Sequence, residues 1–94
     1  MLPKVILRGY VVVPREDLEA IKRELPIHIE NTRKEEGCLI FDVIQENEHS
    51  TRFNVHEEFI DKESFQVHQE RVRNSNWGKI SRNIERHYHI EQNN

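Results

Sequence analysis

The chain has 94 residues, of which 35% are hydrophobic and 33% charged, with a formal net charge of −3. No run approaches the roughly 20 apolar residues that a membrane-spanning helix needs. No basic stripe is present to bind nucleic acid, so neither a membrane nor a nucleic acid is expected as a partner. A chain of this length predicts a single domain, residues 1–94, with a thin hydrophobic core.

The cellular compartment is indicated by cysteine usage and by the N-terminal residues. Cys38 is the single cysteine, which excludes an intramolecular disulfide and suits a reducing environment. The N-terminal stretch lacks the long apolar run and the small-residue cleavage site of a secretory signal peptide. We therefore expect a cytoplasmic protein.

The first third of the chain predicts a strand followed by a helix. Lys4 to Val13 is rich in β-branched residues and is closed by Pro14, which is typical of a strand. Glu16 to Glu35 has apolar residues at helical spacing along one side. Pro26 should kink or divide this helix, since proline removes a backbone donor. Gly37 is a natural stop.

The rest of the chain predicts two strands, a helix and a last strand. Cys38 to Gln45 is apolar on both faces, and Arg52 to Phe59 alternates apolar and polar residues. Asp61 is expected to cap a long helix that runs to about Glu85, with a possible break near the segment NSNWG. Arg86 to Glu91 alternates again and closes the domain.

The resulting order, βαββαβ, predicts an α+β fold of the ferredoxin-like type, with four antiparallel strands and both helices on one face. The second face would then be bare. It should carry Ile6, Tyr10, Ile40 and Ile44, and an apolar patch of this size should be covered by another surface. We expect a homodimer formed face to face between two sheets.

Three titratable side chains are predicted to point into the space between helices and sheet: His28, Glu57 and His68. Groups of this kind in a dry site must be paired, neutral or next to water. They could be core residues bonded to the backbone, or they could line a small-molecule cavity. No metal is expected, because the spacing lacks a recognised ligand motif. The charged run at 33–36 fits a solvated helix end.

Two segments carry a resemblance to a known family. Thr32 to Phe41 reads T-R-x-E-x-G-C-L-x-F, and Glu57 to Gln69 reads E-x-F-x-D-x-x-x-F-x-x-H-Q. The chain resembles the antibiotic biosynthesis monooxygenase (ABM) domain family, in particular its small stand-alone members of the quinol monooxygenase type. The resemblance implies a dimeric α+β barrel. It also implies oxidation of a small aromatic or quinol-like substrate with O₂, without metal, flavin or other cofactor.

With that chemistry, His68 is the leading candidate for the base, because an imidazole titrates near working pH. His28 would be a second acid–base or orienting group. Glu57 would fix a tautomer or pair with a protonated imidazole. The residues expected to contact the substrate are Thr32, Phe41, Phe53, Phe65 and Trp77.

Two other functions remain open from the sequence. The segments FDVIQ and RFNV also resemble the LsrG-like proteins, which implies an isomerase that moves a proton on a small carbonyl compound. A dimer that binds a small ligand without turnover could use the same cavity. The chemical state of His68 separates catalysis from binding, since a binder tolerates glutamine at that position.

Overall fold

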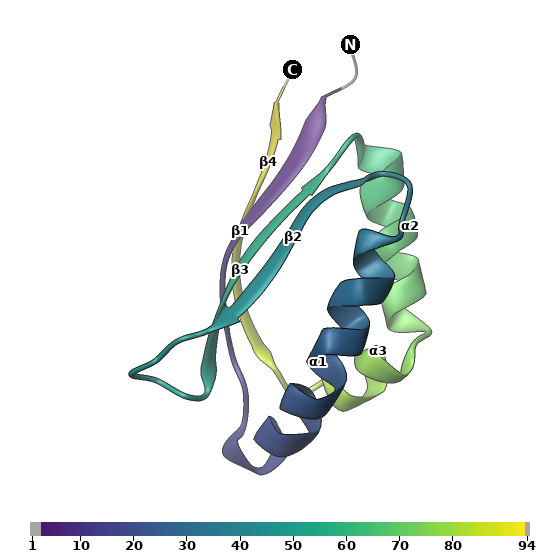
Figure 1. Ribbon diagram of the computed structural model, residues 1–94. Coiled ribbons are helices and arrows are strands. Elements are labelled where there is room, and N and C mark those ends of the chain that lie inside the picture. The colour runs from purple at the N-terminus through teal and green to yellow at the C-terminus, as the bar shows by residue number, and fades with distance from the viewer. Residues whose placement is uncertain (1–2, 94) are drawn as a thin grey trace.

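The computed structural model describes residues 3–93 as one four-stranded sheet with helices packed on one of its faces (Figure 1). The strands are ordered β2-β3-β1-β4, and every neighbouring pair is antiparallel. This is the expected α+β ferredoxin-like βαββαβ fold. The elements are β1 (Lys4–Val12), η1 (Arg15–Asp17, a 3₁₀ turn), α1 (Leu18–Arg33), β2 (Cys38–Gln45), β3 (Arg52–Phe59), α2 (Lys62–Arg73), α3 (Asn76–Ile80) and β4 (Glu85–Asn93).

The bounds of β2 and β3 are those predicted, whereas the helices differ. The first helix begins with the 3₁₀ turn and ends at Arg33, and Pro26 lies inside it without dividing it. The second helix is divided in two at the segment NSNWG, where a break was predicted, and it ends at Ile80, before the expected Glu85. Ser75 separates the two parts, because its hydroxyl donates to the Val72 carbonyl (2.7 Å) and accepts from the Gly78 N–H (3.2 Å). Those bonds end α2 and cap α3.

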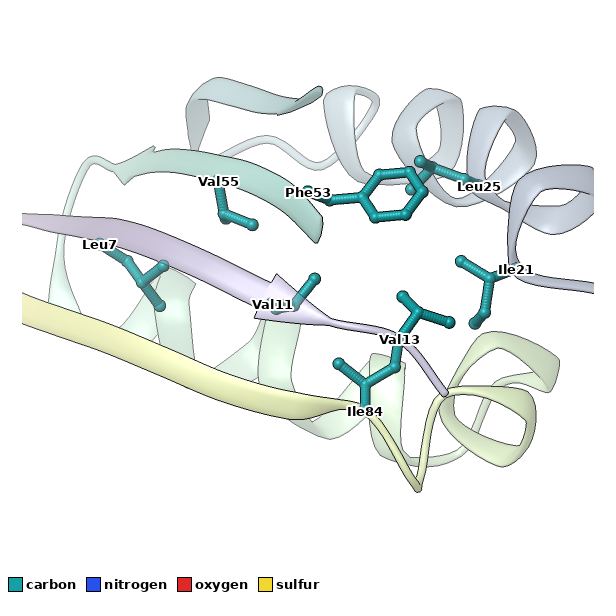
Figure 2. Packing of buried hydrophobic residues seen from close by; sticks show 8 residues of the cluster. All are labelled: Leu7, Val11, Val13, Ile21, Leu25, Phe53, Val55 and Ile84. Carbon is teal, nitrogen blue, oxygen red and sulfur yellow. The ribbon is translucent and has the colours of Figure 1, made fainter. Parts of the chain in front are cut away.

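The core lies between α1 and the inner face of the sheet (Figure 2). Phe53 of β3 extends toward Leu25 of α1, and Val13 lies near Ile21. Alternation along each strand sends one set of side chains inward, as a sheet covered on one face requires. The cluster of buried residues is Leu7, Val11, Val13, Ile21, Leu25, Phe53, Val55 and Ile84. No helix within residues 3–93 is long and apolar enough to cross a membrane.

The outer face of the sheet is more polar than the sequence suggested. Ile44 is exposed, but Ile6 is buried, so the expected apolar patch is only partly present. Tyr10 stacks on the His87 ring (4.6 Å between centroids). The Arg52 guanidinium lies over the Tyr10 ring in a cation–π contact. Three histidines contact a glutamate two residues away on the same strand: His56 with Glu58 (2.8 Å), His87 with Glu85 (2.7 Å) and His89 with Glu91 (3.0 Å).

At Gly9 the backbone of β4 lies close to β1. A Cβ atom built there would lie 1.9 Å from the His87 carbonyl oxygen, which is backbone and cannot rotate away. We expect Gly9→Ala to destabilise the protein by roughly 2 kcal/mol or more, because the strands must separate or distort. Urea denaturation measures this, with Glu19→Ala on the exposed side of α1 as the control. Equal midpoints for the two variants would contradict the prediction.

Candidate functional site

A cavity of about 360 Å³ lies between the helices and the sheet, and all three helices contribute to its wall. A smaller pocket of about 50 Å³ shares five of its lining residues and therefore lies directly beside it. The side chains there that carry chemistry are His28 of α1, Glu57 of β3, His68 of α2, Trp77 of α3, and Arg86 and Tyr88 of β4.

His68 is held in a single orientation by contacts on both sides of its ring. The residue is 4% exposed, and its ring lies against the rings of Phe59 (4.9 Å) and Phe41 (5.6 Å). Its Nδ1 lies 3.0 Å from a Glu35 carboxylate oxygen. A carboxylate accepts hydrogen bonds only, so Nδ1 carries the proton and Nε2 is the free, basic nitrogen. Burial lowers the pKa of His68, and Glu35 partly opposes that shift.

Glu57 faces that free nitrogen across the cavity. Its Oε1 lies 3.9 Å from Nε2 of His68, which is too long for a hydrogen bond and leaves both atoms available to a ligand. Burial, and then the negative charge of Glu35, raise the pKa of Glu57 to about 7, while Arg86 acts in the opposite direction. Near neutral pH this carboxyl can therefore either accept or donate a proton.

His28 lies beside this pair and stays neutral. Burial lowers its pKa to about 3, with His68 and Arg71 adding to the shift. Its ring stacks on Trp77 at 4.5 Å with an angle of 5° between the planes. Its Nδ1 is buried without a hydrogen-bond partner among residues 3–93. These properties suit an orienting or hydrogen-bonding group better than a base that works near neutral pH.

β4 supplies the outer part of the cavity. Tyr88 is 37% exposed, and burial of its hydroxyl together with the charge of Glu57 raises its pKa to about 12. Its hydroxyl therefore remains a donor at working pH. Arg86 donates to the carbonyl oxygens of Ser81 and Ile84, each at 3.2 Å, and is in this way fixed to the turn before β4.

The residues expected to contact the substrate are placed in different ways. Trp77 forms a wall of the cavity, and Phe41 lines the smaller pocket beside it. Thr32 is fully buried and lines neither of the two. Its hydroxyl donates to the His28 carbonyl oxygen (2.8 Å) and accepts from Arg71 (2.9 Å). Thr32 therefore supports the helices behind the site, and the structure gives it no contact with the cavity.

Phe53 and Phe65 also lie outside the cavity. Phe65 packs on Phe59 at 5.5 Å between ring centroids. Phe53 lines a different groove, a wider one of about 630 Å³ on the other side of α1. That groove is more open and apolar, and it contains none of the buried titratable residues. The cavity that holds His68 and Glu57 is therefore the better candidate for a chemical site.

Three participants were missed in the sequence. Glu35 lies in the run assigned to a solvated helix end, yet it binds His68, a residue 33 positions away. Tyr88 and Arg86 lie on the inner face of β4, where alternation places them with the cavity residues. The strand pattern could have indicated these two, but no local pattern indicates Glu35. Within residues 3–93, no group of three or more His, Cys, Asp or Glu is placed to hold a metal ion.

Comparison with known proteins identifies the family. The family description "Antibiotic biosynthesis monooxygenase" (ABM) matches residues 5–74. The chain therefore belongs to the ABM family, as its motifs suggested. A comparison with curated proteins gives no significant match.

Solved structures show the same fold at low sequence identity. A Nitrosomonas europaea protein, whose name assigns it to the antibiotic biosynthesis monooxygenases, is 21% identical with a TM-score of 0.75, over 96% of this chain and 86% of the other. MupZ from Pseudomonas fluorescens is 22% identical with a TM-score of 0.74, over 96% and 68%. PA3566 from Pseudomonas aeruginosa is 22% identical with a TM-score of 0.71, over 98% and 92%.

The raised pKa of Glu57 predicts a pH-dependent cost in stability. The folded state binds the Glu57 proton more tightly than the unfolded state. The stability that protonated Glu57 contributes is therefore complete below about pH 4.5 and is lost as the pH rises through 7. The shift corresponds to about 3 kcal/mol. We expect Glu57→Gln, which has no proton to lose, to gain stability relative to the wild type over that pH range.

Urea denaturation between pH 4.5 and 8 measures this difference, with Glu48→Gln in the exposed turn as the control. A constant difference between wild type and Glu57→Gln across this pH range would show that Glu57 has an ordinary pKa.

Proposed function

We propose that the chain is a cofactor-independent monooxygenase that oxidises a small aromatic or quinol-like substrate with O₂. Membership of the ABM family supports the reaction class. The observation that carries the proposal is the facing pair in the cavity, His68 Nε2 and Glu57 Oε1, 3.9 Å apart and both free to meet a ligand.

The proposed chemistry begins with removal of a phenolic proton. The substrate hydroxyl lies between the two groups, and His68 takes the proton on Nε2, because its Nδ1 is already protonated toward Glu35. Glu57, ionised in part near neutral pH, stabilises the imidazolium that forms. The electron-rich anion then reacts with O₂: one oxygen atom is added to the ring, the other leaves as water, and the quinol becomes a hydroxyquinone. In the absence of a cofactor, the substrate supplies all the reducing electrons, which is why a quinol is suitable.

The size and walls of the cavity support a particular range of substrates. A volume of about 360 Å³ is at the low end of small-molecule sites, which span roughly 300–1,000 Å³. Trp77, His28 and Phe41 offer ring faces and edges to an aromatic ligand. We therefore expect substrates of one or two rings to bind better than larger polycyclic ones.

An isomerase of the LsrG type is the second candidate. A carboxyl with a pKa of about 7 that faces a free imidazole nitrogen at 3.9 Å provides the acid and the base that a proton shuttle between two carbons needs. This reaction consumes no oxygen and would introduce solvent deuterium into the substrate or product. The third possibility, a ligand-binding dimer without turnover, requires only the shape of the cavity.

We also propose that the protein works as a homodimer joined through the outer face of the sheet. This face carries charges of both signs, so two copies can be complementary across a twofold axis. Arg8 lies in register between His56 on β3 and His89 on β4. We expect Arg8→Glu to convert a dimer to a monomer in sedimentation velocity, whereas the exposed Lys62→Glu on α2 leaves it unchanged. A monomeric wild-type protein would exclude this proposal.

O₂ uptake tests the proposed reaction. We expect the purified, metal-free protein to consume O₂ faster than autoxidation with one-ring or two-ring quinols. His68→Ala should reduce the enzymatic rate by about 10²-fold or more, since a positioned base typically contributes that much. Glu57→Gln should reduce it as well. The control is His49→Gln, which changes an exposed histidine in the turn before β3.

The possible outcomes separate the three functions. Uptake that survives His68→Ala would remove the assigned base. No uptake with any quinol or phenol, together with deuterium incorporation into a carbonyl compound, would favour the isomerase. Ligand affinity that is unchanged in His68→Gln, with neither oxygen consumption nor deuterium incorporation, would favour the binding protein.

A further inference from the structure

Glu35 lies outside the cavity and yet contacts the group assigned as the base. Its two carboxylate oxygens lie 3.0 and 3.2 Å from Nδ1 of His68. The carboxylate is not among the cavity-lining groups and instead borders a separate surface depression with Glu36 and Ser64. A ligand in the cavity therefore meets His68 and does not meet Glu35.

A network on the far side of His68 also links Glu35 to Arg71, in addition to the contact of Glu35 with the imidazole. The Arg71 Nε donates to one Glu35 oxygen, and another nitrogen of the same guanidinium donates to the Thr32 hydroxyl. Thr32 in turn donates to the His28 carbonyl oxygen. The side chain of Glu35 is 16% exposed. The carboxylate is thus fixed by α2, and α2 is linked through the same contacts to α1.

We propose that Glu35 is a positioning residue for the reaction proposed above, because it fixes the proton of His68 on Nδ1 and so keeps Nε2 available as the base. An orienting carboxylate of this kind selects the tautomer and stabilises the imidazolium without taking the proton itself. Without it, a neutral imidazole can carry its proton on Nε2, which would then be unable to accept a second one there.

The charges that face His68 come from each element packed around it. Glu35 approaches from the connection between α1 and β2, and Glu57 from β3. Arg71 lies on α2 itself, and the neutral His28 lies on α1 at 6.2 Å between ring centroids. Glu35 is the negative group in hydrogen-bond contact with the ring. Removing its charge should therefore lower the pKa of His68 further, whereas removing Arg71 should raise it.

A purely structural role for Glu35 makes a different prediction. If Glu35 served only to tie the α1–β2 connection to α2, Arg71→Gln would reproduce the effects of Glu35→Gln, because both break the same ion pair. In a positioning role the two variants act on His68 in opposite directions. Stability can fall in both without affecting this comparison.

The test is ¹⁵N NMR of the histidine rings over a pH titration, without substrate, for the wild type, Glu35→Gln, Arg71→Gln and Glu36→Gln. Glu36 is the adjacent exposed residue and serves as the matched control. We expect wild type, Arg71→Gln and Glu36→Gln to show the proton on Nδ1 of His68. Glu35→Gln should show a mixture of tautomers and a lower pKa.

Kinetics give a second measurement if the oxygenase reaction is found. We expect Glu35→Gln to lower kcat by about 10- to 100-fold, as orienting partners typically do. KM should change little because Glu35 does not touch the cavity, and Glu35→Asp should recover part of the rate. An unchanged His68 tautomer and pKa in folded Glu35→Gln would overturn the inference. The NMR result is independent of turnover, so it stands or fails separately from the proposed oxygenase reaction.

Discussion

Burial of ionisable side chains between helices and sheet is the constraint on which this site depends. The inner face of the sheet must be dry where α1 and α2 cover it, yet Glu57, His28 and His68 lie there. Burial disfavours the charged form of each group. It therefore raises the pKa of the carboxyl and lowers that of both imidazoles, so that all three are largely or partly neutral near pH 7.

The same burial gives the groups different chemical roles. His28 is too weakly basic to be protonated in ordinary buffers, so it can orient a ligand only through hydrogen bonds and ring contact. Glu57 is poised near neutrality. His68 differs from both because the Glu35 carboxylate offsets part of the pKa shift that burial causes. A small protein with a thin core thus keeps several buried polar groups, at a cost in stability that the removal of Glu57 would relieve.

The sequence predicted the fold well because its signals are local. The bounds of β3 follow from alternation, and those of β2 follow from an apolar run between Gly37 and the turn that joins the two strands. The inward direction of His28, Glu57 and His68 follows from periodicity, and the structure places all three at one cavity. The segment NSNWG indicated a break in the second helix, and the capping bonds of Ser75 set its place.

The parts of the site that the sequence did not predict depend on tertiary contacts. The link from Glu35 to His68 joins residues distant in the chain, and it arises only when the α1–β2 connection packs beside α2. Phe53 and Phe65 are expected from the sequence to contact the substrate, but the position of a residue along the helix–sheet layer depends on tertiary packing, which places both outside the cavity. In β4, histidine and glutamate occupy alternate positions, and the sequence therefore indicates that they share the outer face of the sheet.

The stacking of Trp77 on His28 has a practical consequence for spectroscopy. Trp77 is the single tryptophan of the chain, and it forms part of the cavity wall. When the protein is excited at a wavelength that tyrosine does not absorb, its intrinsic fluorescence therefore comes from one indole at the site of interest. A ligand that enters the cavity changes the surroundings of this indole. Occupancy can thus be followed by emission without a label, and compounds can be screened for binding before any reaction is known.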